Sequence, residues 1–555
     1  MLALCALVPA CLAASHLANV PDAAHDGAVA RVLGLQEQPW RALDVLVGAP
    51  LAMLPIGTRA MRAAMGDVLV TAVAGATLYS LIAGLLAICA ETRRLGFLVA
   101  AVAAVLPLVG APWQIEASAV GGSVAGALLV IVPLAFAVRD ASSARPGTLG
   151  AAAAFTLGLA VGYEPLVGCC AAAGTVTYVA MGSGLRSATS RASAVVPAFV
   201  LGLTPLAIAI GHTRGSGASM AEALGMAWSG ERGASHAGSP LPFVREEIGP
   251  VLTLLAAAGG ALAMFVGRAR PLALALAAVA VAGLGAGWLG APVGPTRFGA
   301  PVLAGFAALA ALAAVAMQGA VRAVAQARVP MARTSAAMIL VLEAVMPVEF
   351  ADDALARAPA RGSGATAYWS DATWGSLPLR SAVIVPDRRL YERALADEAC
   401  DAVRPDLVIV PAYPRAAGAR RSLADDASLI PLRRDLELTE IPTEESLSSL
   451  AVHRPVAVAF DGRWGRALAR HLVPLSLLDR FEPEPRGASD RRHALDGLGP
   501  WRDRVVRAIA GDPELVGATV SLLKARENAV GFDSDKELLL RVHADVAAID
   551  REHGR

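Results

Sequence analysis

The sequence predicts an α-helical polytopic membrane protein with about eleven transmembrane helices, followed by a C-terminal exported α/β domain. Hydrophobic residues make up 55% of the chain and charged residues only 17%, and the mean hydropathy is +0.55. Apolar runs of about 20 residues, the length that crosses a hydrocarbon core, recur through the first two thirds of the chain. After that point the sequence becomes mixed and rich in Arg, Asp and Glu, which indicates a second domain.

We expect eleven spans, near residues 2–20, 67–90, 95–111, 119–138, 148–164, 166–182, 193–211, 249–266, 272–289, 298–317 and 334–348. The predicted domains are a transmembrane domain at 1–348 with an outward loop at 21–66, a small α/β domain at 349–481, and a linker with C-terminal helices at 482–555. The first run lacks a basic start and ends in small residues, so it is either an uncleaved span or a cleaved signal peptide.

Basic residues in the short loops predict the orientation, because Lys and Arg resist translocation. Alternating the spans places eleven arginines on one side, which is then the cytoplasm: Arg93, Arg94, Arg139, Arg145, Arg186, Arg191, Arg268, Arg270, Arg322, Arg328 and Arg333. The loop 21–66 and everything after residue 348 therefore face outward. We expect a bacterial inner (plasma) membrane protein with a periplasmic C-terminal domain.

The C-terminal region alternates short β-type runs with helical stretches. The runs at 382–385, 407–410 and 456–460 predict parallel strands of a small sheet. Residues 482–500 are rich in Pro and charge and predict a linker, with two or three amphipathic helices over 501–550. The region has no glycine-rich phosphate loop and no metal-spaced His or Cys cluster, so no cofactor or metal is assigned. The net charge of +1 indicates no nucleic-acid partner.

A motif follows the first apolar run, at Asp22, His25, Leu33, Gly34, Glu37, Pro39, Leu43 and Leu54-Pro55-Ile56-Gly57. Its spacing fits without a gap the pattern Asp-small-Gly-Glu, then Leu-Gly-Val-Ala-His-Pro-Pro-Gly-Tyr-Pro-Leu, then Leu-Pro-Phe-Gly. The motif thus resembles the first outward loop of a bacterial membrane-protein family long labelled as of unknown function. That family is related to a eukaryotic protein O-mannosyltransferase and carries the GT-C glycosyltransferase architecture. Two segments of the C-terminal region, 404–408 and 453–456, also resemble the family's exported strands.

The motif departs from the family pattern at its acid and its imidazole. His25 stands on the Glu position and Glu37 on the His position, while Gln38, Trp40 and Arg41 replace Pro, Gly and Tyr. If His25 and Glu37 face each other, the exchange preserves an acid–imidazole pair beside Asp22. If they do not, the loop is a decayed form of a catalytic one.

The resemblance implies an inverting transfer of a sugar from a polyprenyl-phosphate donor to a protein or glycan acceptor on the exported side. Asp22 would then be the catalytic base, with His25 and Glu37 beside it. Taken alone, Asp22 after Pro21 also suits a turn or a helix N-cap. Membrane lipid is an expected partner in either case.

Four further residues are candidates for substrate binding. Arg214 and Arg297, near predicted span ends, suit a lipid phosphate, although arginines at such positions also anchor helix ends. In the loop before the fourth span, Glu116 suits sugar hydroxyls. Trp113 suits stacking on a sugar ring, or else belongs to the aromatic belt at the membrane interface.

The segment 40–54 predicts an amphipathic helix along the membrane surface, with Leu43, Val47 and Leu51 on one side and Arg41 and Asp44 on the other. Two alternatives to an enzyme remain open. One is a catalytically degenerate homologue that binds or assembles a glycolipid. The other is a transporter, which would require intramembrane charges and broken helices.

Overall fold

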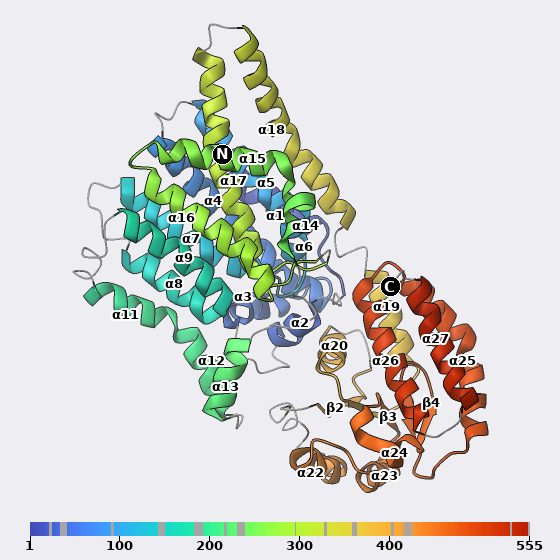
Figure 1. Cartoon of the computed structure of the whole chain (residues 1–555). Coiled ribbons are helices and arrows are strands. Elements are labelled where there is room, and N and C mark those ends of the chain that lie inside the picture. Colours follow the sequence, from blue (N-terminus) through green and yellow to red (C-terminus); the bar gives the residue numbers. More distant parts are fainter. Residues whose placement is uncertain are drawn as a thin grey trace.

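The protein consists of a helical bundle with a mixed α/β part beside one end of it (Figure 1). The computed structural model describes residues 1–20, 25–33, 41–89, 94–142, 150–182, 192–215, 219–229, 239–294, 296–326, 330–357, 363–400, 404–413, 416, 423, 426–532 and 536–552. Asp22 and Glu37 lie outside these residues, so whether Glu37 faces His25 stays a prediction.

A helix coincides with each of the eleven predicted spans. The bundle contains α1 (Leu2–Ser15), α4 (Arg59–Cys89), α5 (Arg94–Val109), α7 (Val124–Ser142), α8 (Gly150–Tyr163), α9 (Pro165–Gly182), α11 (Ala192–Gly202), α12 (Thr204–Gly215), α15 (Gly249–Met264), α16 (Arg270–Gly285), α17 (Ala300–Gln326) and α18 (Pro330–Arg357). Helix α17 is central and packs against α15, α16, α5, α7 and α18. Its alanines let neighbouring backbones approach closely, as membrane helices do.

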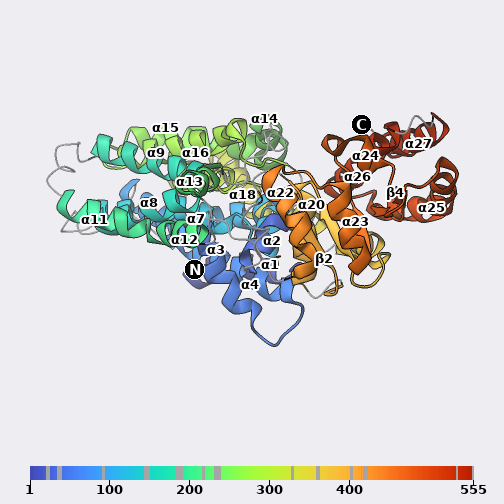
Figure 2. The same ribbon diagram turned by 90° about the horizontal axis from the view of Figure 1, so that it is seen from below.

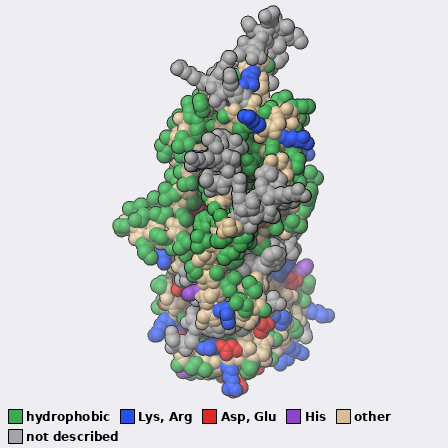
Figure 3. Space-filling view, turned by 90° about the vertical axis from the view of Figure 1, so that its left-hand side faces the viewer, with side chains coloured by type: hydrophobic (Ala, Val, Ile, Leu, Met, Phe, Trp, Pro, Cys, Tyr) green, Lys and Arg blue, Asp and Glu red, His purple; other side chains and the backbone are tan. Residues whose placement is uncertain are grey.

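The chain is a multi-pass membrane protein. Among the described residues, five helices are long and apolar enough to cross a membrane, and up to seven if each of two bent helix pairs counts as one span. Figure 3 shows hydrophobic side chains covering the bundle, whereas the acidic side chains in that view lie toward the other end of the molecule. The predicted total of about eleven spans stays a prediction.

Two predicted spans are bent. Helix α5 ends at Val109, and the chain continues through Gly110 as α6 (Ala111–Ser118) at an angle of 62°. The loop predicted around Trp113 and Glu116 is therefore a short buried helix. Helices α11 and α12 meet at 42° inside the predicted span 193–211. Two short helices follow, α13 (Met220–Ser229) and α14 (Pro240–Phe243).

The predicted amphipathic helix is present as α3 (Ala42–Ala52), but its polar side faces inward. Arg41 and Asp44 are 1% and 4% exposed, whereas Leu46 and Met53 are 63% and 84% exposed. A helix that buries charge and exposes leucine is stable where lipid, rather than water, contacts its outer side. The charged residues of α3 therefore belong to the interior of the bundle.

The C-terminal part contains a five-stranded mixed sheet with the order β2-β1-β3-β5-β4. Strands β1 (Ala382–Val385), β2 (Val408–Pro411) and β3 (Val456–Val458) are parallel and lie where the β-type runs predict them. Strands β4 (Leu472–Pro474) and β5 (Asp479–Phe481), which were not predicted, pair antiparallel and extend the sheet from β3. The helices before and between the strands are α19 (Ser363–Ser370), α20 (Arg388–Ala399), α22 (Ile430–Leu438), α23 (Glu444–His453) and α24 (Gly465–Ala469).

Most of the predicted linker, residues 482–500, is helical. Helix α25 (Ala488–Ile509) occupies most of the predicted linker, and α26 (Pro513–Gly531) and α27 (Lys536–Glu552) follow it. Ile509, Leu523 and Val546 share one hydrophobic core with Val383 of the sheet. The apolar sides of these amphipathic helices therefore belong to the same folded unit as the strands.

Helix α2 (Asp26–Val32) lies between the bundle and the C-terminal part. It packs against α20, and the two helices appear side by side in Figure 2. Val29 and Val32 of α2 share a buried cluster with Ala396 of α20 and Ala63 of α4. Helix α2, which belongs to the predicted outward loop, therefore contacts both parts.

Candidate functional site

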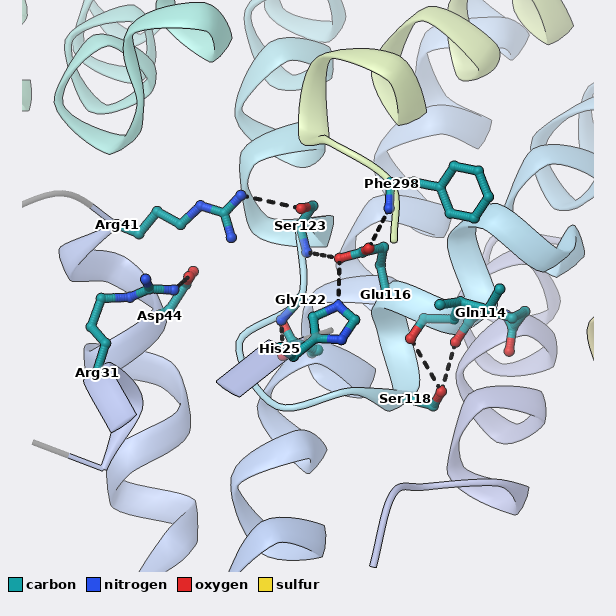
Figure 4. A network of polar contacts seen from close by, with 12 residues as sticks. His25, Arg31, Arg41, Asp44, Gln114, Glu116, Ser118, Gly122, Ser123 and Phe298 are labelled. Carbon is teal, nitrogen blue, oxygen red and sulfur yellow. Dashed lines mark hydrogen bonds and ion pairs between the residues drawn. The ribbon is translucent and has the colours of Figure 1, made fainter. Parts of the chain in front are cut away.

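Glu116 and His25 are joined at the end of the bundle next to the C-terminal part. His25 immediately precedes α2 and Glu116 lies on α6, and both side chains are buried. His25 Nε2 is 3.3 Å from Glu116 Oε2. A carboxylate only accepts hydrogen bonds, so Nε2 donates in this contact. Figure 4 shows the imidazole pointing directly at the carboxylate.

Glu116 also receives two backbone hydrogen bonds. Its Oε2 accepts from the Ser123 N–H at 2.7 Å, and its Oε1 accepts from the Phe298 N–H at 2.6 Å. One carboxylate thus holds together the first loop, the turn before α7 and the segment before α17 (Figure 4). The bend between α5 and α6 is what turns Glu116 toward these partners.

Arg41 and Glu164 form a second buried pair. Arg41 Nη2 lies 3.2 Å from Glu164 Oε2 and donates to Ser123 Oγ at 3.2 Å, while the Arg41 N–H donates to the Tyr163 carbonyl at 2.9 Å. Arg41 adopts a left-handed backbone conformation with φ of 54°. Since Ser123 contacts both Arg41 and Glu116, the two pairs form one network.

Arg31 and Asp44 form the third pair. Arg31 Nη2 is 3.4 Å from Asp44 Oδ2, and the Tyr163 hydroxyl donates to Asp44 Oδ1 at 2.9 Å. These groups come from α2, α3 and α8. Buried ions cost free energy unless each has a partner, and three pairs at one end of a membrane bundle are a feature that function, rather than stability, explains best.

Asp67 adds a further buried acid to the network. It lies on α4, is 6% exposed, and its Oδ2 accepts from the Gly122 N–H at 3.1 Å. Asp67 and Asp44 line a narrow cleft of about 10 Å³, which is room for about one water molecule. The other residues of this cleft are Val32, Val47, Gly48, Ala63, Gly66, Val70, Gly121 and Ala125.

Arg297, a predicted binding residue near a span end, lies next to this network. It immediately precedes Phe298, whose N–H binds Glu116, and the charges of Arg297 and Glu116 attract each other. Burial and repulsion by the positive charge of Arg41 lower the pKa of Arg297 to about 10, against the attraction of Glu116. Arg297 and Glu116 are thus the two predicted binding residues that the structure brings together.

Trp113 and Arg214 are not part of this network. The Trp113 side chain is fully buried and its Nε1 donates to Thr71 Oγ1 at 3.2 Å. It therefore presents no ring face to a sugar, and it is not part of an interfacial belt. Arg214 is exposed in the last turn of α12, unlike the buried network.

Several residues of the network were missed by sequence reasoning. Arg31, Asp67, Tyr163 and Glu164 carry no motif, and Arg41 and Asp44 were singled out as the polar side of the predicted amphipathic helix and not as site residues. The sequence nonetheless contained an indication of these residues, because each ionisable side chain lies in or beside an apolar helix. Ionisable side chains at such positions in membrane proteins are costly and are generally paired.

The comparison with protein-family profiles found no match, and the search of curated proteins found none. Among solved structures, the chain is similar to the oligosaccharyltransferase of Archaeoglobus fulgidus in its apo form, with a TM-score of 0.46 and 14% identity over 83% of this chain and 69% of that one.

Further solved structures of oligosaccharyltransferase from the same archaeon are also similar. The structure of AglB from A. fulgidus in complex with an inhibitory peptide and a dolichol-phosphate has a TM-score of 0.47 and 11% identity, over 99% of this chain and 86% of that one. A third, tethered to an acceptor peptide, has a TM-score of 0.46 and 13% identity over 83% and 69%. These scores are too low to assign a fold or an activity by themselves.

Proposed function

We propose that this protein is a membrane glycosyltransferase of the GT-C type, which transfers a sugar from a polyprenyl-phosphate donor to a protein or glycan acceptor on the exported side of the membrane. The observation that carries the proposal is the buried network of His25, Glu116, Arg41, Glu164 and Asp44 where the first loop meets the bundle. Such a site combines carboxylates, which can accept a proton from an acceptor, with guanidinium groups, which can bind a phosphate.

Asp22 is the proposed catalytic base. It precedes His25 by three residues in the sequence, and we propose that it acts beside the His25–Glu116 pair. The base removes a proton from the acceptor hydroxyl or amide nitrogen as that atom attacks the anomeric carbon, and the bond from this carbon to the phosphate oxygen breaks. His25 and Glu116 position the loop that carries Asp22, and Glu37 is proposed to act beside them.

Arg297 is the proposed partner of the donor phosphate. The departing phosphate gains negative charge in the transition state, and a guanidinium binds a phosphate through two donors at once. The inward-facing charges and outward-facing leucine of α3 support the same assignment. They let a lipid chain stay in the membrane while its head group reaches the network.

A transporter is the second candidate, and one observation favours it. A transporter requires broken helices that carry charge inside the membrane, and Glu116 lies on the second half of the bent pair α5–α6. A degenerate homologue that only binds a glycolipid would use the same network without turnover. Proteoliposomes distinguish these alternatives, since a transporter moves its solute without consuming a lipid-linked sugar.

The proposal is tested with the purified full chain in lipid nanodiscs and a panel of polyprenyl-phosphate sugars. We expect donor-dependent transfer to an acceptor in the wild type, and at least about 100-fold less in Asp22→Asn. Asp352→Asn serves as the control, since Asp352 is exposed on α18. Equal turnover in Asp22→Asn and wild type would falsify the assignment of Asp22, and absence of turnover with every donor would refute the enzyme.

A further inference from the structure

The C-terminal part is held against the first loop at both ends of α20. At the C-terminal end of α20, the Ala399 carbonyl accepts a hydrogen bond from Arg59 Nη1 of α4 at 3.1 Å. Along its middle, Ala396 packs into the cluster that contains Val29 of α2. Near its N-terminal end, Glu392 reaches α2 itself. Helix α20 therefore forms the direct contact between the C-terminal part and the loop that carries the proposed base.

Glu392 lies directly against Gly27. A Cβ atom added at Gly27 would be 2.6 Å from Glu392 Oε2, closer than two such atoms can approach without contact strain. The carboxylate is held from the other side by Arg388, whose Nε donates to Glu392 Oε1 at 2.7 Å. Residue 27 is therefore a glycine at a point where a side chain of the C-terminal part lies against the backbone of α2.

The charge of Glu392 reaches the buried network through Arg31. Burial lowers the pKa of Arg31, and the negative charges of Asp44 and Glu392 both oppose this effect. Arg31 lies on α2 beside Gly27 and pairs with Asp44, which in turn accepts from Tyr163 of α8. Three charged residues, Glu392, Arg31 and Asp44, thus connect the C-terminal part through α2 to the bundle.

We infer that Glu392 is a positioning residue, through which the C-terminal part holds α2 so that His25 faces Glu116. The site is then complete only while α20 is docked on α2. Whether α2 is held in place can be measured without any catalytic turnover, so the inference is testable by itself. Only its effect on turnover rests on the proposed function.

Two pairs of matching chemistry allow a controlled test. Arg388–Glu392 and Arg433–Glu437 are both i,i+4 pairs with an Nε to Oε1 distance of 2.7 Å, but the second lies on α22, away from α2. Hydrogen–deuterium exchange of residues 25–33 is measured in the full chain for Glu392→Gln and Glu437→Gln. We expect exchange about tenfold faster in Glu392→Gln and unchanged exchange in Glu437→Gln. Equal exchange in both variants and the wild type overturns the inference.

A second variant tests the contact from the other side. Alanine has a higher helix propensity than glycine. If no neighbouring residue contacted position 27, Gly27→Ala would therefore slow the hydrogen exchange of α2. We expect it to accelerate exchange instead, because the new Cβ displaces Glu392. Glu392→Asp is one methylene shorter, and the double variant Gly27→Ala/Glu392→Asp should restore protection. Gly517→Ala is the control, since an added Cβ there meets open space on α26. Slower exchange in Gly27→Ala contradicts the inference.

Turnover provides the last readout. If Glu392 only positions α2, then Glu392→Gln lowers kcat about tenfold or more at an unchanged KM for the lipid donor, since displacing a catalytic loop costs rate rather than ground-state binding. A raised donor KM at unchanged kcat would instead make Glu392 a binding residue and overturn the positioning role. If the wild type shows no turnover, the exchange measurements still decide the inference, while the proposed function fails.

Discussion

His25 and Glu116 are 91 residues apart in the chain, and their side chains meet at 3.3 Å in the interior of the protein. The contact joins the first loop to a helix that continues a bent span. Around it, Ser123 and Phe298 donate backbone N–H groups to the same carboxylate. Glu116 is therefore the group on which the arrangement of the site depends.

Glu116→Gln should destabilise the protein and move the first loop. The substitution keeps the shape of the side chain but removes the charge that accepts from His25 and two backbone N–H groups. Hydrogen bonds to a charged group are worth about 1.5–3 kcal/mol, so we expect the free energy of unfolding to fall by about 2 kcal/mol. Thermal unfolding in detergent measures this, with Glu484→Gln as an exposed control. An unchanged melting temperature would show that Glu116 is not ionised in the folded protein.

The orientation of α3 makes a prediction that needs no activity. A nitroxide label at Leu46→Cys should be accessible to oxygen dissolved in the lipid, because Leu46 is 63% exposed, whereas one at Ala52→Cys should be shielded, because Ala52 is buried. The two exposed native cysteines, Cys11 and Cys169, are first replaced by serine. The matched comparison is between two positions on one helix. Greater lipid accessibility at Ala52 than at Leu46 would mean that α3 is turned the other way.

Local sequence patterns predicted most of the helices and three of the strands. Long apolar runs and short β-type runs each determine an element by their own length and composition, and α17 and β1 lie where these patterns place them. The strands β4 and β5 were missed because they form through antiparallel pairing with distant partners, β5 with β3 and β4 with β5. The linker was predicted from Pro and charge, but α25 forms there because its apolar side packs against the sheet.

The site was predicted only in part, because its contacts join distant segments. His25 and Glu116 were both candidates, but nothing local indicated that they meet. The spacing of polar residues in α3 predicted an amphipathic helix correctly, while which side faces inward depends on Tyr163 and Glu164 of another segment. Hydrophobic periodicity predicts that such a helix has a polar and an apolar side. In a membrane it does not tell which of the two sides faces the interior of the protein.

The Arg404–Asp406 pair should make stability depend on pH. Arg404 donates from Nε and Nη2 to the two oxygens of Asp406, at 2.7 and 2.8 Å, and also from Nη2 to the Pro378 carbonyl at 2.9 Å. These bonds, together with the Arg380 N–H, hold the pKa of Asp406 well below its ordinary value of 3.8.

Because the folded-state pKa is the lower one, the stabilisation is complete above the unfolded value and is lost as pH falls toward the folded value. We expect the melting temperature of the full chain to fall between pH 5 and pH 3, values that bracket the ordinary carboxyl range of about 4. The fall should be smaller in Asp406→Asn. Asp371→Asn is the control, and an equal fall in all three proteins would rule out this contribution.

Arg526→Met should destabilise the C-terminal part strongly. Arg526 on α26 donates to Asp479 Oδ1 of β5 at 2.7 Å and to the Ser476 and Leu478 carbonyls at 2.7 and 2.9 Å, and both charged side chains are buried. Burial already raises the pKa of Asp479, against the opposing charge of Arg526. Removing only the cation leaves a buried carboxylate without its charged partner, which costs about 3–5 kcal/mol.

The double variant Arg526→Met/Asp479→Leu removes both charges and should recover much of the loss, since a buried ion pair adds little over apolar packing. Arg526→Lys should be less stable than this double variant, because one ammonium group cannot reach the carboxylate and both carbonyls together. Chemical denaturation followed by Trp fluorescence compares the three, with Arg541→Met as an exposed control. If Arg526→Met unfolds no earlier than the control, α26 does not stabilise the sheet, and residues 482–555 would be a separate unit after all.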